Sequence, residues 1–334
     1  MVKSNAPSAG VHEEINLPHT AAIELYHNAL SFCSQKVRVC LAEKGIDYES
    51  NHIHLIKTEW HENCSSLYKE VNPAITVPVL VHHGHPIYES LSQIQYIETL
   101  KPIPELIPKG LEEKVAFWTA TAEVEIEGGE LGSMTEEALN AAAARCFGTS
   151  VAMLSMPVFL SLYEDITWGN IFHGFLVYPN FGKAFTSFIM KLFGSNFITM
   201  APFSTKSVPI ISVGRKHTRQ HLEELDKALR MDGRPYATGA DFTMADVALI
   251  SLFERLWQGN YEFLFEDLLA VKAYWQRIQS RSSFKQAILE HRLPIMNKAR
   301  ARIISMKEKV PAYKDALEGK HARGMSETDA LMSH

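Results

Sequence analysis

Cys33 is the residue whose type and position best suit covalent chemistry. It stands in the segment 24–45, whose pattern predicts a strand, a short loop and a helix in that order. A thiolate at the head of a helix faces unpaired backbone N–H groups and the positive end of the helix dipole. Lys36 and Arg38 would add positive charge nearby. These features support a reactive Cys33 and an inert one about equally, whereas Cys40 falls on the apolar face and is expected to be inert.

The cysteines and histidines do not follow the spacing of a disulfide framework or of a metal site. The four cysteines form no CxxC pattern, which indicates a reducing compartment and a cytoplasmic protein. His61 and Cys64 are three residues apart, but no further ligand converges on them in the sequence. We therefore predict no metal site, and we expect Cys64 to lie in a polar loop where its thiol could be exposed.

The segment 71–100 supplies groups for binding a small peptide-like ligand. Val77 and Pro78 open a strand, a tight turn and a return strand follow, and Glu89 and Ser90 open the next helix. Proline has no N–H, and a cis bond would present the backbone of Val77 sideways to an extended ligand. Ser90 and the first N–H groups of its helix suit a ligand carboxylate.

The order of these elements resembles the N-terminal domain of the glutathione transferase family, which has the thioredoxin fold. The Val77-Pro78 pair and the Glu89-Ser90 pair carry the resemblance, which extends over residues 23–291. It implies that glutathione is the co-substrate. It also implies that Val77, before a cis-Pro78, pairs with the cysteinyl backbone of glutathione, and that Glu89 and Ser90 hold the γ-glutamyl end.

The resemblance also implies a role for Cys33, which stands where the family has its thiol-activating residue. Cysteine at that place is similar to the omega class and to the reductive dehalogenases of chlorinated hydroquinones. The surrounding segment is also similar to the ganglioside-induced differentiation-associated proteins. Residues 243–246 match the N-capping box of the family's buried helix, which is a folding element.

Two positions depart from the family pattern or match it weakly. The family often has Gly-Lys before the Val-Pro pair, and this chain has Ile75 and Thr76 there. Family members hold the glycyl carboxylate of glutathione with a Lys, Gln or His after the second strand. Lys57 is a weak candidate for that role in this chain.

The composition predicts two domains. The chain has 334 residues, 46% of them hydrophobic, and its net charge of −5 gives no reason to expect a nucleic-acid partner. The first 20 residues are polar and lack the pattern of a signal or transit peptide. We predict a fold of an α/β, thioredoxin-like domain followed by an all-helical domain. The predicted parts are a flexible tail at 1–20, the thioredoxin-like domain at 21–101, a proline-rich linker at 102–109, the helical domain at 110–312 and a polar tail at 313–334.

The segment 147–203 is rich in aromatic residues and poor in charge. It has no uninterrupted apolar run of the roughly 18 residues that a membrane-spanning helix needs. We favour an extension of the helical core. The alternatives are an aromatic wall over the active site, which would suit an aromatic substrate, and an interfacial segment that contacts membrane, which we favour least.

These observations predict a cytoplasmic glutathione transferase, as in detoxification, with Cys33 as the catalytic thiol. Its substrate would be a hydrophobic, aromatic electrophile, and the reaction conjugation, thiol transfer or reductive dehalogenation. No motif selects glutathione-dependent ether cleavage. A homodimer is expected only by analogy with the family. The alternative is a binding protein, non-catalytic or membrane-associated, that keeps the fold.

Overall fold

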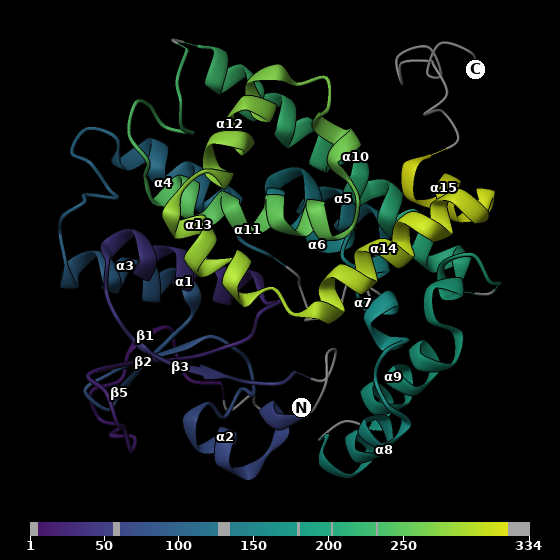
Figure 1. The fold of residues 1–334 in the computed structure, drawn as a ribbon, viewed down its shortest axis with the longest axis horizontal. Helices are drawn as coiled ribbons and strands as arrows, with labels where there is room; N and C mark the ends of the chain where they lie inside the picture. Colours follow the sequence, from purple (N-terminus) through teal and green to yellow (C-terminus); the bar gives the residue numbers. More distant parts are fainter. Residues whose placement is uncertain are drawn as a thin grey trace.

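Five short strands form one sheet in the N-terminal domain of a computed structural model of the chain (Figure 1). The structure describes residues 6–55, 61–125, 134–178, 181–201, 203–231 and 233–319. The sheet order is β1-β5-β4-β2-β3, with β2 and β3 parallel and the other neighbouring pairs antiparallel. The strands are β1 (Gly10–Val11), β2 (Ile23–His27), β3 (Glu49–His52), β4 (Val79–His82) and β5 (His85–Tyr88).

Three helices complete this domain, and local sequence signals mark both ends of the first. They are α1 (Phe32–Lys44), α2 (Ser66–Val71) and α3 (Ser90–Leu100), with a short 3-10 helix, η1 (Glu62–Cys64), before α2. The Ser31 hydroxyl caps α1 by accepting the Ser34 N–H at 3.2 Å. Gly45 ends the helix with φ of 54°, a left-handed conformation that glycine adopts readily. Together with β2 to β5, these helices form the predicted thioredoxin-like domain.

The predicted flexible tail at 1–20 is wrong from residue 10 onward. β1 pairs with β5, and the Leu17 N–H donates to the Gly84 carbonyl at 2.7 Å. The Leu17 side chain is buried in a small cluster with Val79, Val81 and Tyr88. An edge strand has unpaired backbone groups, and the N-terminal segment satisfies some of those of β5.

The second domain is all-helical, as predicted (Figure 1). α11, which Thr243 and Asp246 start with a capping box, packs against α1, α4, α6 and α14. One hydrophobic core runs without a break from Leu25 of β2 through α11 to Leu317. The α-helices are α4 (Glu112–Thr121), α5 (Glu136–Arg145), α6 (Phe147–Met153), α7 (Met156–Tyr163), α8 (Trp168–Val177), α9 (Phe181–Phe193), α10 (Ser204–Arg230), α11 (Met244–Gln258), α12 (Leu269–Gln279), α13 (Ser282–Ala287), α14 (Pro294–Lys309) and α15 (Pro311–Glu318). The 3-10 helices are η4 (Gly194–Ile198), η5 (Glu262–Phe265) and η6 (Leu289–His291).

The predicted polar tail at 313–334 is also wrong at its start. α15 continues the domain to Glu318, with Tyr313 and Leu317 fully buried in the core. These apolar residues recur at helical spacing, which buries one face of a short helix. Lys307 of α14 forms an ion pair with Glu318 at 2.5 Å. The remainder of the predicted tail, from residue 320, lies outside the described residues.

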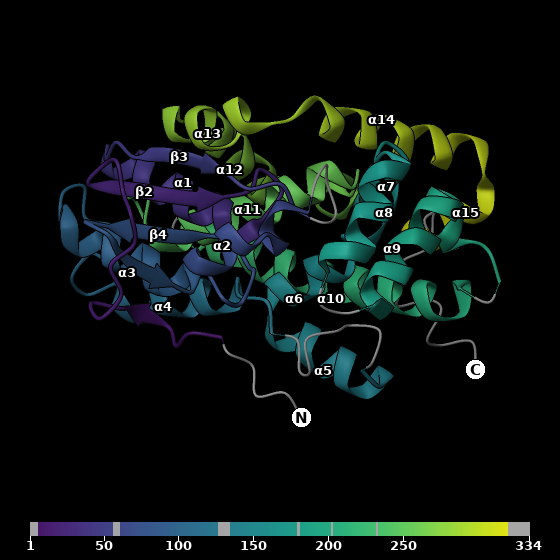
Figure 2. The same ribbon diagram turned by 90° about the horizontal axis from the view of Figure 1, so that it is seen from below.

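The aromatic segment 147–203 has two different environments. α6 and α7 belong to the core, with Phe147 and Tyr163 buried, as predicted. α8 and α9 form a hairpin that exposes several large apolar side chains, so the predicted extension of the core is wrong for this part of the segment. Figures 1 and 2 place this hairpin toward the other end of the long axis from α3. No helix within the described residues is both long and apolar enough to cross a membrane.

Candidate active site

One cleft of about 250 Å³ brings together five of the six residues predicted for the site. The sixth, Lys57, lies outside the described residues. The cleft is formed by the head of α1, the segment before β4 and the head of α3. The predicted residues that line it are Cys33, Val77, Pro78, Glu89 and Ser90.

Cys33 is the second residue of α1, as its predicted place at the loop-to-helix junction requires. It is partly exposed, whereas Cys40, Cys64 and Cys146 are buried. Burial raises the pKa of Cys64 to about 11 and that of Cys146 to about 11, and it raises the pKa of Cys40 further. The burial of Cys40 agrees with its expected inertness, whereas the expectation that the Cys64 thiol could be exposed is wrong, because Cys64 is 2% exposed.

The loop that precedes Cys33 is held from several sides. The Asn28 side chain accepts the Leu30 N–H at 2.9 Å and donates to the Ile53 carbonyl at 2.8 Å. The Gln35 amide donates to the Ala29 carbonyl at 3.0 Å. A loop fixed in this way positions the first turn of α1, and with it the thiol, without help from a ligand.

The two cations expected near Cys33 are engaged elsewhere. Lys36 is buried and pairs with Glu123 at the start of the helical domain. Arg38 is also buried and donates to the Ala287 carbonyl at 2.8 Å and to the Asn28 carbonyl at 3.1 Å. Both cations therefore attach α1 to neighbouring segments. Of the positive groups that the sequence predicted near the thiol, the N-terminal end of α1 is the one that remains there.

The bond between Val77 and Pro78 is cis. The Gln93 side chain of α3 donates to the Pro78 carbonyl at 3.0 Å and to the Ile87 carbonyl at 2.8 Å, which anchors the turn to the helix behind it. Among the described residues, no hydrogen bond uses the Val77 N–H. This N–H is therefore available for an extended ligand in the cleft.

Glu89 and Ser90 form the opposite wall of the cleft. Glu89 is exposed and has a φ of 66°, which is rare for a residue with a side chain and is found mostly at functional sites. Ser90 is the first residue of α3 and is 4% exposed. Within the described residues, no group is hydrogen-bonded to its hydroxyl. The hydroxyl and the N-terminal end of α3 can therefore receive a carboxylate.

Three polar residues that were not predicted for the site also line the cleft. Asn72 and Thr76 border the segment before the cis bond, and the Asn72 amide donates to the Thr76 carbonyl at 2.9 Å. Tyr88 donates to the Val71 carbonyl at 2.8 Å. Ile75, where the family often has glycine, has a φ of 55° and is a further strained position beside the cleft. In the sequence, the sign that this segment is unusual was the absence of the family's Gly-Lys pair before Val77.

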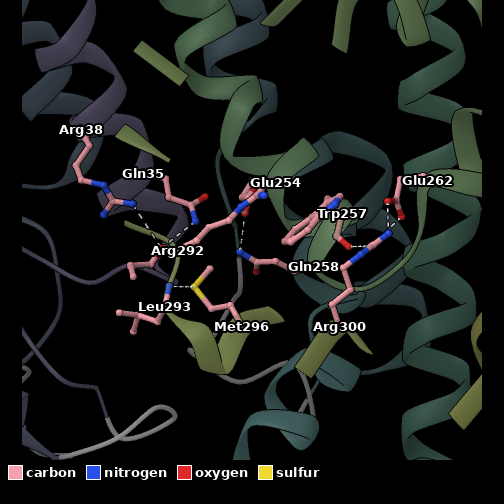
Figure 3. Close-up of polar contacts among 11 residues, drawn as sticks. Gln35, Arg38, Glu254, Trp257, Gln258, Glu262, Arg292, Leu293, Met296 and Arg300 are labelled. Carbon is pink, nitrogen blue, oxygen red and sulfur yellow. Dashed lines mark hydrogen bonds and ion pairs between the residues drawn. The ribbon is translucent and has the colours of Figure 1, made fainter. Parts of the chain in front are cut away.

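Polar side chains also join the two domains next to the site. Arg255 of α11 donates to the Leu30 carbonyl at 2.6 Å, and its guanidinium lies between the rings of Phe32 and Phe159 at 4.4 and 4.9 Å. Figure 3 shows Gln35 and Arg38 of α1 near the ion pair between Glu254 of α11 and Arg292, which are 2.6 Å apart. The loop before Cys33 is thus attached to the core of the helical domain.

Within the described part of the chain, no group of three or more His, Cys, Asp or Glu residues could hold a metal ion. His61 instead contacts the Asn170 carbonyl of α8 at 2.7 Å. The described residues that line the cleft include no aromatic residue of the 147–203 segment. The cleft can therefore bind an extended peptide-like ligand beside a cysteine thiol.

Comparison with known families matches both domains separately. The model "Glutathione S-transferase, N-terminal domain" matches residues 30–100, which hold the cleft from Cys33 to Ser90. The model "Glutathione S-transferase, C-terminal domain" matches residues 212–288, from α10 to α13. The segment with α8 and α9 lies between the two matches.

Two relatives illustrate how the similarity is distributed. Glutathione S-transferase TCHQD of Arabidopsis thaliana is 25% identical over 272 residues, which are 80% of this chain and 89% of that protein. Maleylacetoacetate isomerase of Rattus norvegicus is 40% identical over 90 residues, which are 27% of this chain and 41% of the isomerase. The higher identity is thus confined to a short segment.

Solved structures share the fold across both domains. A beta-etherase, LigF, from Sphingobium sp. strain SYK-6 has a TM-score of 0.58 and 17% identity, over 81% of this chain and 100% of that one. Glutathione transferase F7 from Populus trichocarpa has a TM-score of 0.53 and 18% identity, over 81% and 100%. Because both domains are matched in the order in which the structure has them, the chain belongs to the glutathione transferase superfamily, whose members use glutathione as co-substrate.

Proposed function

We propose that this enzyme binds glutathione in the cleft and uses Cys33 as a nucleophile in thiol transfer or reductive dehalogenation. The observation that carries the proposal is the position of a partly exposed cysteine, at the head of a helix, in the same cleft as the Val77 backbone and Ser90. Val77 would pair with the cysteinyl backbone of glutathione. Ser90, Glu89 and the N-terminus of α3 would hold the γ-glutamyl end, with Lys57 as a candidate for the glycyl carboxylate.

The reaction follows thiol–disulfide exchange. The Cys33 thiolate attacks the glutathionyl sulfur of a mixed disulfide or of a glutathionylated aromatic compound. A bond forms between Cys33 and glutathione, and the other group leaves with the electron pair and takes a proton. A second glutathione thiolate then attacks this mixed disulfide, releases oxidised glutathione and restores the Cys33 thiolate. A serine at this position cannot form the intermediate.

Two further reactions of glutathione fit the same cleft. Conjugation of a hydrophobic, aromatic electrophile requires only that the protein stabilise the glutathione thiolate, which the N-terminus of α1 can do. Isomerisation is supported by the 40% identity to the rat isomerase over 90 residues. The non-catalytic alternative would keep glutathione binding without turnover.

The test compares the wild-type protein with Cys33→Ser. We expect the wild type to be retained on a glutathione column and to reduce hydroxyethyl disulfide with glutathione. The variant should bind glutathione and lose disulfide reduction, while conjugation of 1-chloro-2,4-dinitrobenzene persists. Reduction at the wild-type rate by Cys33→Ser would exclude the nucleophilic role. A wild type that binds glutathione and turns over none of these substrates would support the non-catalytic alternative.

A further inference from the structure

The α8–α9 hairpin carries most of the exposed large aromatic side chains of the described residues. Four of the five exposed phenylalanine and tryptophan residues are on it, and the fifth is Phe117 of α4. Two exposed leucines extend the same surface, one on each helix. We define the aromatic face as Trp168, Phe172, Leu176, Phe181, Phe185 and Leu192, which are 44% to 85% exposed.

The aromatic face is one contiguous surface on an amphipathic hairpin. Trp168, Phe172 and Leu176 recur every four residues along α8, so they share one side of that helix. The rings of Phe181 and Phe185 stack at 6.5 Å between centroids. The opposite side of the hairpin is buried against α7, with Ile171 1% exposed and Ala184 4% exposed in the core. Trp168 also contacts Phe188, and Phe181 contacts Phe175, with ring centroids 5.8 and 5.6 Å apart, so these two residues of the face also link the helices.

The α8–α9 hairpin itself carries charge of one sign. No aspartate or glutamate lies between Asp165 and Glu223, although the whole chain has a net charge of −5. Within α8 and α9 the charged residues are the lysines at 183 and 191. The Lys191 ammonium lies 5.7 Å from the centre of the Trp168 ring, at the border of the face. An apolar, aromatic hairpin that carries lysines and no acidic residue complements an anionic, amphipathic partner.

The hairpin is a separate addition beside the glutathione-binding domain. It lies outside both segments matched by the family models. Its inner side contacts that domain through His61, which stacks on His173 at 6.0 Å. Figures 1 and 2 show α8 and α9 at the lower side of α7, with their remote ends away from the helical core. The side chains of the aromatic face, 44% to 85% exposed, are accessible to an approaching surface.

We propose that the aromatic face docks the protein onto an anionic lipid surface. Trp168 and the phenylalanines would enter the boundary between headgroups and acyl chains, and Lys191 would face anionic headgroups. The hairpin would lie in the plane of the interface, since none of the described helices spans a membrane. A second copy of the chain is a less suitable partner, because a symmetric contact would bring the same lysines together.

The test is flotation with vesicles of phosphatidylcholine alone and of phosphatidylcholine with phosphatidylserine, at physiological salt. The wild type should float with the anionic vesicles and much less with the neutral ones, and higher salt should reduce flotation. Phe172→Ser with Phe185→Ser should lower flotation by roughly tenfold or more, since two large apolar side chains are lost. Glutathione binding by this variant should be unchanged, which separates the result from the proposed function.

The matched control removes two exposed apolar residues from other surfaces. Leu67 of α2 and Leu269 of α12 are both 76% exposed, so Leu67→Ser with Leu269→Ser should float like the wild type. Failure of the wild type to float with anionic vesicles would overturn the proposal, and so would an equal loss in the control. If the aromatic variant changes the sedimentation coefficient from that of a dimer to that of a monomer and the wild type does not float, the face is a subunit contact instead.

Discussion

Ser90 is the residue whose surroundings most clearly invite a charged ligand group. Its hydroxyl is nearly buried, lines the cleft and starts a helix. We expect Ser90→Ala to weaken glutathione binding by about 1.5–3 kcal/mol, the range for a hydrogen bond to a charged group. Calorimetry measures this loss. Ser92→Ala, two residues later on α3 and outside the cleft lining, is the control. Unchanged affinity in a well-folded Ser90→Ala protein would remove Ser90 from the site.

Cys33 differs from the other three thiols in accessibility. It alone is partly exposed, and burial raises the pKa values of Cys40, Cys64 and Cys146. Iodoacetamide should therefore modify Cys33 first at neutral pH, because the thiolate is the nucleophile. Mass spectrometry of peptides after short exposures gives the order. Equal labelling of Cys33 and Cys40 in the folded protein would contradict both the packing of α1 and the proposed chemistry.

Among the elements, α11 has a role that reaches beyond its own domain. Its capping box at Thr243 and Asp246 starts the helix, and Arg255, in the last turn, is 3% exposed and binds the Leu30 carbonyl. The guanidinium lies over the ring of Phe32, the residue before Cys33. α11 therefore helps to position the loop from which the thiol is presented.

Arg255→Lys tests this positioning role. Lysine keeps the charge but lacks the planar group that stacks on Phe32 and Phe159. We expect kcat for disulfide reduction to fall by about tenfold, which corresponds to about 1.4 kcal/mol, with little change in glutathione affinity. Arg300→Lys is the control, since Arg300 binds Glu262 and the Trp257 carbonyl in the helical domain (Figure 3). It should lower stability and leave kcat unchanged. The same kcat for both variants would refute the role of Arg255.

At the scale of the whole molecule, the contact between the sheet and the C-terminal helices contains neutral histidines. The His27 ring lies 5.1 Å from that of His291, and the His52 ring is also nearby. Burial and the charge of Arg38 lower the pKa of His27 to about 2 and that of His291 to about 4. Unfolding would return both groups to about 6.5.

These depressed pKa values predict a loss of stability in acid. Below about pH 6.5 the unfolded chain binds protons that the folded chain excludes, so stability falls as the pH decreases toward 4. Between pH 7 and 5 the loss should be on the order of 1 kcal/mol per histidine. Urea unfolding at both pH values measures it, and His291→Asn should reduce the difference. His83→Asn, in an exposed turn, is the control. The histidine assignment fails if His291→Asn leaves the pH dependence unchanged.

Sequence alone determined the elements that local signals specify. The loop-to-helix junction at Cys33, the Val77-Pro78 turn, the head of α3 at Ser90 and the capping box at residues 243–246 all depend on residues within one turn or hairpin of each other. The two-domain fold followed from their order. The cleft could also be anticipated, because the family pattern implies that these separated residues converge.

Tertiary structure decided what depends on partners distant in the sequence. Residues 10–20 look like a polar tail until the free edge of β5 pairs with them, and α15 becomes part of the core only when Tyr313 and Leu317 meet it. The charge of Lys36 is directed to Glu123, 87 residues away. Segment 147–203 is rich in aromatic residues both where it is buried and where it is exposed. Packing buried α6 and α7 and left the aromatic face of α8 and α9 exposed to solvent. Burial is a property of the assembled core, so composition could not assign it.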